Sequence, residues 1–345
     1  MSDFQNTIDL LGDAVVTEKI LNKSIEQYND DVLKMVGVYG FYNCTNLTSV
    51  DLPSVKSLGT QAFDYCSNLT SANIPSVQTF GKYAFNKCSK LTSVDAPLAT
   101  STNYGAFAEC KELVSVNFPS LKTLGTRTFY ECVKLSGIYL PMLTSVDSGA
   151  FYNCSAMTTA EMTSVINIGD NAFRNTKLTE VYYPHAVTVG SDAFMLCSNL
   201  TSVYLPLVTE IKNNVFKSCS NLQYIEFGTI TKIGDDAFSS CSRLNSIPTQ
   251  NVTSVGKQAF NYCTGLTSLD LSSVTSIGTY AFRGCSKLAS IHLPSKPPTL
   301  SSTNATDGLY ASCVFYIPRG SLAAYQAATN WSSLTSQYTF TEEDR

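Results

Sequence analysis

The segment GTQAFDYCSNLTSANIP, residues 59–75, returns with changes about twelve times along this chain of 345 residues. Its Phe-x-x-Cys core is the clearest marker, because successive phenylalanines are 22 residues apart except for one step of 21, from Phe173 to Phe194. In the copy that begins at Phe173, Thr176 replaces the cysteine. A fixed period of this length is the signature of a solenoid, in which each repeat forms one coil and contacts only its neighbours.

Each repeat has two halves with different patterns. The first half reads Leu-x-x-Val-x-Leu-Pro, as in residues 47–53, and predicts a short strand with alternating burial that ends at the proline. The second half reads Val-x-x-Ile-Gly-x-x-Ala-Phe-x-x-Cys, as in residues 274–285, and its apolar spacing of three and four predicts a helical or 3₁₀ turn. We expect a positive φ at its glycine. Asn103 and Asp147, which occupy that position in two copies, also tolerate a positive φ, but Lys212 does not fit this explanation.

The cysteines belong to the repeat rather than to a disulfide framework. Eleven of the twelve share one position in the repeat, and only Cys313 lies outside it. Coils stacked about 4.8 Å apart would hold these side chains parallel, which does not suit a disulfide. We therefore expect buried free thiols that act as small apolar fillers and weak donors, and we expect no metal site because the chain has no CxxC pair. The predicted structural ladder includes Phe63, Cys66, Phe85, Cys88, Phe151, Cys154, Phe238 and Cys241.

Composition and charge exclude several classes of function. Charged residues make up 14% of the chain, and the net charge of −4 with a pI near 5.3 gives no basic footprint for nucleic acid. No apolar run of 18 residues predicts a membrane span. Residues 1–20 contain four acidic side chains and do not form a secretory signal. The compartment stays open: the protein remains in the cytoplasm by default, leaves by another route, or has lost a leader.

The two ends of the chain depart from the repeat. Residues 1–35 are predicted to form an N-terminal cap, with a short helix from Ser2 or Asp3 to Leu11 and a degenerate first strand around Tyr28. The solenoid covers residues 36–318.

Residues 319–345 are predicted to form a C-terminal cap. Ser321 would cap a helix from Leu322 to Thr329, and Trp331 would close the last coil. We expect residues 335–345 to be a frayed tail.

The repeat resembles a known family. Leu-x-x-Val-x-Leu-Pro matches the strand half of the leucine-rich repeat, and the continuation Ile-Gly-x-x-Ala-Phe-x-x-Cys-x-x-Leu is similar to the BspA-like leucine-rich repeats of bacteria. The resemblance covers roughly residues 36–318, and the ending that contains Trp331 is similar to the terminal cap of that family. It implies an α/β leucine-rich repeat solenoid, right-handed and curved, with about twelve rungs, strands on the concave face and 3₁₀ or helical turns on the back. It also implies a surface or secreted protein that binds host proteins or other cells.

A candidate binding patch lies on the predicted concave face. Two positions in each strand half point away from the core: the one between Val and Leu, and the one two residues earlier. In the middle copies these positions hold Tyr139, Glu161, Glu180, Tyr182, Tyr204, Tyr224 and Glu226. Tyrosine is enriched at the centres of interfaces, and the acidic residues would favour a cationic partner. The alternative is that these tyrosines only suit strands and pair with their neighbours.

The sequence gives no sign of catalysis. His185 and His292 are about five coils apart, roughly 24 Å by strand spacing, and the chain contains no HExxH, GxSxG, P-loop or dinucleotide-binding motif. Glu161 and Glu180 are better explained as solvated acids. We therefore predict a non-catalytic, monomeric binding or adhesion module for a protein or glycan, without a cofactor or a metal. The alternatives are a structural or assembly spacer and, less favoured, an enzyme of unrecognised type.

Overall fold

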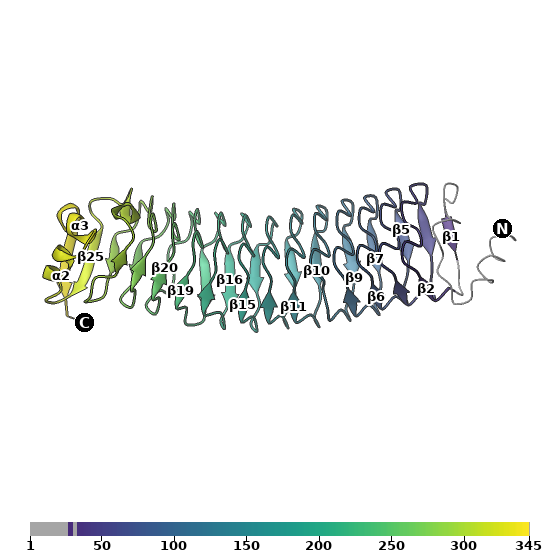
Figure 1. The fold of residues 1–345 in the computed structure, drawn as a ribbon, viewed down its shortest axis with the longest axis horizontal. Coiled ribbons are helices and arrows are strands. Elements are labelled where there is room, and N and C mark those ends of the chain that lie inside the picture. The colour runs from purple at the N-terminus through teal and green to yellow at the C-terminus, as the bar shows by residue number, and fades with distance from the viewer. Residues whose placement is uncertain (1–26, 30–32, 345) are drawn as a thin grey trace. The chain divides into compact units, whose positions relative to one another are not determined.

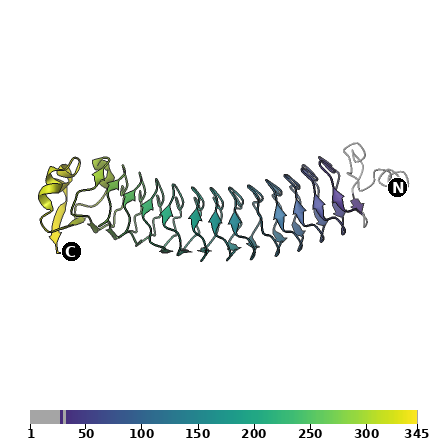
Figure 2. The same cartoon turned by 60° about the horizontal axis from the view of Figure 1, so that its bottom comes forward.

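The computed structural model describes residues 27–29 and 33–344, which belong to two compact units, Met1–Leu178 and Thr179–Arg345. Each unit is a stack of parallel coils (Figures 1 and 2). The boundary between the units follows Thr176, in the copy whose spacing is one residue short. The predicted N-terminal helix lies outside the described residues.

One three-residue strand from each coil forms the first ladder of the N-terminal unit. These strands are β1 (Gln27–Asn29), β3 (Ser49–Asp51), β5 (Ser71–Asn73), β7 (Ser93–Asp95), β9 (Ser115–Asn117), β10 (Gly137–Tyr139) and β12 (Thr159–Glu161). Equivalent residues of neighbouring repeats pair in parallel in two sheets, one from β1 to β9 and one of β10 with β12, as Val94 does with Val116. The burial pattern of β5 and β7 is exposed, buried, exposed, so the predicted alternation is confirmed.

A second ladder lies where the sequence predicts a helical turn. It contains the two-residue strands β2 (Met35–Val36), β4 (Ser57–Leu58), β6 (Thr79–Phe80), β8 (Ser101–Thr102), β11 (Ser145–Val146) and β13 (Asn167–Ile168). The residues that follow each of these strands form consecutive tight turns. The predicted helical turn is therefore wrong. The apolar spacing is misleading because consecutive tight turns, like a helix, bring residues three and four apart to the same side. The fold is therefore mostly strand.

Hydrogen bonds in the turns run alternately within a coil and to the next coil. The N–H of Ala62 donates to the carbonyl of Gly59 in the same coil, whereas the N–H of Gln61 donates to the carbonyl of Lys82 in the next coil. Gln61 and Tyr65 both have a positive φ, of 56° and 62°. Every later copy in the unit repeats these two positions with positive φ, at Tyr83/Lys87, Gly105/Glu109, Arg127/Glu131, Gly149/Asn153 and Asn171/Asn175.

The glycine of the repeat is needed for close approach and not for a positive φ, so the predicted reason was wrong. Gly59 and Gly81 are absent from the residues with positive φ, as are Asn103 and Asp147. A Cβ on Gly81 would lie 2.5 Å from the backbone carbon of Gly59 in the preceding coil. Next to Asn103, the second ladder is reduced to isolated bridges, one of which joins Ser101 to Thr123.

The C-terminal unit contains two ladders of the same kind. The first contains β14 (Glu180–Tyr182), β16 (Ser202–Leu205), β18 (Tyr224–Phe227), β21 (Ser268–Asp270), β23 (Ser290–His292) and β25 (Val314–Pro318). The second contains β15 (Thr188–Val189), β17 (Glu210–Ile211), β19 (Lys232–Ile233), β20 (Ser254–Val255), β22 (Ser276–Ile277) and β24 (Thr299–Leu300). The coil with Ile247 has no strand in the first ladder, since Pro248 lacks an N–H for pairing. Its strand in the second ladder is β20. Each unit thus has seven coils, and the two units together have fourteen. The total exceeds the predicted number of about twelve because the coils of β1 and β25 lack the full motif.

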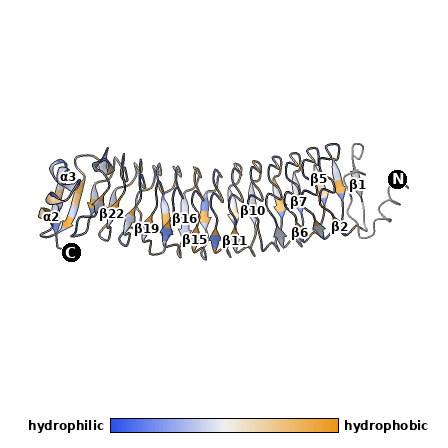
Figure 3. Cartoon of the chain, viewed as in Figure 1, coloured by the Kyte–Doolittle hydropathy of each residue, from blue (hydrophilic) through white to orange (hydrophobic). Residues whose placement is uncertain are grey.

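The chain after β25 is ordered, so the predicted tail is wrong. The loop before β25 contains the 3₁₀ helix η1 (Thr303–Thr306); after it come α2 (Leu322–Ala327), α3 (Trp331–Gln337) and β26 (Thr339–Glu343). β26 pairs in parallel with the apolar strand β25, which is orange in Figure 3. The sequence around β26 has little apolar alternation, because Phe340 lies between two threonines. Phe340 stacks on Phe315 with ring centroids 5.0 Å apart.

Side-chain hydrogen bonds join this C-terminal segment to the coils. The indole N–H of Trp331 donates to the carbonyl of Pro298 at 2.8 Å, and the hydroxyl of Tyr325 donates to the carbonyl of Pro294 at 2.7 Å. Ser321 makes no side-chain cap for α2; the N–H of Leu322 donates to Glu342 Oε1 instead.

Stacked phenyl rings and a column of thiols fill the core of each unit. Ring centroids of neighbouring phenylalanines are 4.8–5.5 Å apart from Phe41 to Phe173 and 5.5–6.1 Å apart from Phe194 to Phe282. Nine thiols donate to the carbonyl of the phenylalanine 25 residues earlier, at 2.9–3.1 Å: those of Cys66, Cys88, Cys110, Cys132, Cys154, Cys219, Cys241, Cys263 and Cys285. These nine are buried free thiols, as the sequence predicts.

We expect Cys44 to be alkylated first when native protein is treated with iodoacetamide at mildly alkaline pH. The neighbouring Cys66 thiol lowers the pKa of half-buried Cys44, whereas burial raises the pKa of Cys110 and Cys154 well above its usual value. The thiolate is the nucleophile, so a lower pKa gives a larger reactive fraction at a given pH. Peptide mapping by mass spectrometry measures the order, and in concentrated urea the thiols should react alike. Equal rates for Cys44 and Cys110 in native protein would contradict the expectation.

Candidate binding surfaces

The outward residues of the first ladder change in character along the N-terminal unit. Asn73 donates to Asp51 at 2.7 Å and Asn117 donates to Asp95 at 2.8 Å, so these amides and carboxylates pair with each other. Two residues of the predicted patch, Tyr139 and Glu161, follow on β10 and β12 and are directly paired in register.

The other five residues of the predicted patch come together on the C-terminal unit. Because β14, β16 and β18 are neighbours, one row holds Glu180, Ser202 and Tyr224, and the row beside it holds Tyr182, Tyr204 and Glu226. We call Glu180, Tyr182, Tyr204, Tyr224 and Glu226 the strand-face patch.

The tyrosines of the strand-face patch form an accessible aromatic surface. The rings of Tyr182 and Tyr204 stack with centroids 4.9 Å apart and an angle of 15° between their planes. Tyr182 is 50% exposed and Tyr224 is 67% exposed, and both glutamates are exposed. Side chains that are rigid, broad and tipped with a hydroxyl can bury area on a partner at a small cost in conformational entropy.

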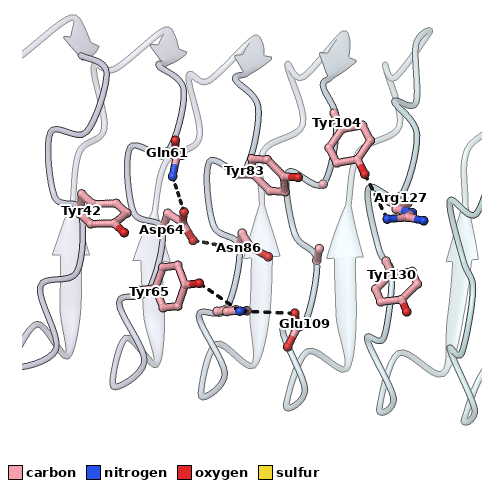
Figure 4. Close-up of a pocket in the computed structure, with 13 residues that line it drawn as sticks. Tyr42, Gln61, Asp64, Tyr65, Tyr83, Asn86, Tyr104, Glu109, Arg127 and Tyr130 are labelled. Atoms are coloured by element: carbon pink, nitrogen blue, oxygen red, sulfur yellow. Dashed lines mark hydrogen bonds and ion pairs between the residues drawn. The ribbon is translucent and has the colours of Figure 1, made fainter.

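A second surface, which the sequence analysis missed, lies on the turn side of the N-terminal unit. Figure 4 shows side chains from successive coils that line a hollow of about 390 Å³. Five tyrosines contribute to it: Tyr42, Tyr65, Tyr83, Tyr104 and Tyr130. We call this hollow the turn-side groove. The sequence signal for the groove is the variation between repeats at turn positions, as at Gly105 between Tyr83 and Arg127.

Hydrogen bonds within and between coils hold the polar side chains of the turn-side groove. Buried Asp64 accepts from Gln61 at 2.7 Å and from Asn86 at 2.8 Å (Figure 4). Burial raises the pKa of the Asp64 carboxyl, and these two hydrogen bonds oppose that rise. The ammonium of Lys87 donates to the hydroxyl of Tyr65 at 3.0 Å and lies 3.8 Å from Glu109.

Two small residues in one coil form the floor of the turn-side groove. Gly105 and Ala108 occupy positions that hold Arg127 and Tyr130 in the next coil and Tyr83 and Asn86 in the preceding one. A Cβ on Gly105 would lie 2.7 Å from the ring of Tyr83, so this glycine provides the space in which that ring lies.

The histidines have separate surroundings. His185 is exposed in a loop, whereas His292 stacks on Tyr316 at 4.7 Å and lies 3.0 Å from Glu343 Oε1. Within residues 27–29 and 33–344, no group of three His, Cys, Asp or Glu side chains could hold a metal ion. In the same part of the chain, no helix has the length and apolar character needed to cross a bilayer.

Coils of one 22-residue repeat each, with stacked parallel strands and inward-facing leucine, phenylalanine and cysteine, define a leucine-rich repeat protein. The family model that matches the chain is the BspA type leucine-rich repeat region, with matches over residues 21–119, 98–201 and 187–305. The chain belongs to the BspA-type leucine-rich repeat family, as its sequence resemblance predicts.

Solved structures agree with this assignment. A leucine-rich repeat protein from Bacteroides ovatus is similar at 26% identity with a TM-score of 0.75, over 93% of this chain and 84% of its own. A leucine-rich cell surface protein from Faecalibacterium prausnitzii is similar in fold at 23% identity with a TM-score of 0.50, over 88% of this chain and 90% of its own. No curated protein matches the chain.

Proposed function

We propose that this protein is a non-catalytic binding module that recognises a protein or glycan through the strand-face patch. The observation that carries the proposal is the stacked pair of exposed Tyr182 and half-buried Tyr204 beside exposed Tyr224. Aromatic residues of this kind are enriched where interfaces contribute most of their binding energy. The unit presents them on a ladder of backbone hydrogen bonds, so little ordering is needed on binding.

The charges of the strand-face patch favour a basic partner. Glu180 and Glu226 lie at opposite corners of the two rows, and neither row contains a lysine or an arginine. Complementary charge at the rim of an interface accelerates association and orients the partner. By family resemblance we further propose that the protein acts at a cell surface, which cell fractionation would test.

Replacing Tyr182 and Tyr204 together with serine tests the patch. We expect the double variant to lose binding to extracellular-matrix proteins or glycans that the wild type captures on an array, without a large change in melting temperature. Tyr310→Ser is the matched control, because Tyr310 is 62% exposed and lies outside the patch in the same unit. Binding that survives the double substitution would exclude the patch.

A further inference from the structure

The turn-side groove has the features of a small-ligand site rather than of an irregular surface. Its volume of about 390 Å³ falls within the range of small-molecule pockets, roughly 300–1,000 Å³. Its polar side chains are hydrogen-bonded to one another, Gln61 to Asp64 within one coil and Asp64 to Asn86 in the next coil. A ligand would therefore meet side chains that are already ordered, which lowers the entropic cost of binding.

The charges in the groove cancel. Its lining includes two acidic residues, Asp64 and Glu109, and two basic residues, Lys87 and Arg127. Lys87 lies 3.8 Å from Glu109, and Arg127 donates to the hydroxyl of Tyr104 at 3.2 Å. A nucleic acid or a sulfated chain would require an excess of positive charge. The balance of charge favours a neutral ligand with many hydroxyl groups.

Two tyrosine rings of the groove, Tyr83 and Tyr104, are partly exposed. Tyr83 and Tyr104 meet edge to face, with centroids 5.2 Å apart and an angle of 72°, so neither ring fully covers the other. By contrast, cations lie over the rings of Tyr65 and Tyr130. The negative face of an aromatic ring attracts C–H groups, and a pyranose carries C–H groups on its flat face and hydroxyls around its rim.

We propose that the turn-side groove binds a neutral oligosaccharide. One sugar ring packs on Tyr83 or Tyr104 over Ala108, since the ring of Tyr83 itself lies against Gly105. Its hydroxyls exchange hydrogen bonds with Lys87 and Glu109. A polyproline helix fits less well, because its rise of about 3.1 Å per residue does not match coils about 4.8 Å apart. The proposal is independent of the strand-face patch, which consists of other residues in the other unit.

The substitution Ala108→Tyr tests the proposal by filling the groove. Tyrosine is native at the equivalent position of the next two coils, as Tyr130 and Tyr152, so the fold should accept it. The probes are native gels that contain laminarin, xyloglucan, galactomannan or glucomannan. We expect at least one of them to retard the full chain. Ala108→Tyr should weaken that binding about tenfold or more, as should Tyr83→Ser.

Further variants and probes distinguish binding in the turn-side groove from binding elsewhere. The strand-face variant with serine at Tyr182 and Tyr204 should bind the polysaccharide unchanged, which separates this proposal from the previous one. If Ala108→Tyr lowers the melting temperature, Tyr104→Ser is used in its place. Three outcomes would overturn the proposal. None of the four polysaccharides retards the protein, the protein binds only heparin or a decaproline peptide, or the groove variants leave polysaccharide binding unchanged.

Discussion

Gly81→Ala is expected to destabilise the N-terminal unit by about 3 kcal/mol or more. The new methyl carbon would lie 2.5 Å from the carbonyl carbon of Gly59, 2.6 Å from its oxygen and 2.7 Å from the nitrogen of Thr60. All three atoms belong to the backbone of the preceding coil and cannot turn aside as a side chain can. The coils must separate, which strains the hydrogen bond from the N–H of Gly81 to the carbonyl of Leu58.

Gly149→Ala is the matched control in the same unit. Gly149 has a φ of +61°, but the nearest atom to its Cβ would be Arg127 Cγ at 3.4 Å. Other copies place Gln61, Tyr83 and Arg127 at this position with a positive φ, so the cost should be only about 1–2 kcal/mol. Urea unfolding monitored by circular dichroism measures both variants. If Gly149→Ala proved as costly as Gly81→Ala, backbone conformation rather than close approach would explain the glycine column.

The strands and the core could be predicted from the sequence because every coil of a solenoid has the same local structure. A period of 22 residues and an apolar residue at every second strand position leave one arrangement in which Val50 and Leu52 face the same side. The stacked phenylalanines and the thiols follow, since residues at the same position in each repeat must lie above one another.

The turns could not be predicted in the same way, because two different physical requirements both favour glycine at a position. Glycine is selected both by a positive φ and by a close backbone, and only the coordinates show that Gly81 meets the second condition. The positions with a positive φ carry Tyr83, Arg127 and Leu196, which sequence rules do not place there. Hydrogen bonds between coils hold them, and these bonds follow from stacking rather than from local preference.

The two candidate surfaces also differ in how far the sequence predicts them. The residues of the strand-face patch were predictable by position, since every second strand residue must point outward. The turn-side groove depends on Gly105 and Ala108 falling in one coil between neighbours with larger side chains. Comparing the turn positions coil by coil would have shown that gap, but the orientation of the rings around it required the structure.

Phe151→Ala is expected to cost about 3–5 kcal/mol, because it leaves a cavity between two rings that cannot move together. Phe151 is fully buried, with its centroid 5.5 Å from that of Phe129 and 5.3 Å from that of Phe173. Its N–H also donates to the carbonyl of Ala172 in the next coil. Thermal unfolding monitored by circular dichroism measures the loss.

Phe41→Ala should cost less, although Phe41 is also buried, because it belongs to the first coil with the full motif. In a stack stabilised by nearest neighbours, an end coil can open without disturbing the rest, whereas a damaged inner coil weakens the contacts on both of its sides. Phe151→Leu keeps most of the volume and should cost no more than about 1.5 kcal/mol. Equal shifts for Phe41→Ala and Phe151→Ala would mean that the unit unfolds as a single cooperative block, and the nearest-neighbour description would then fail.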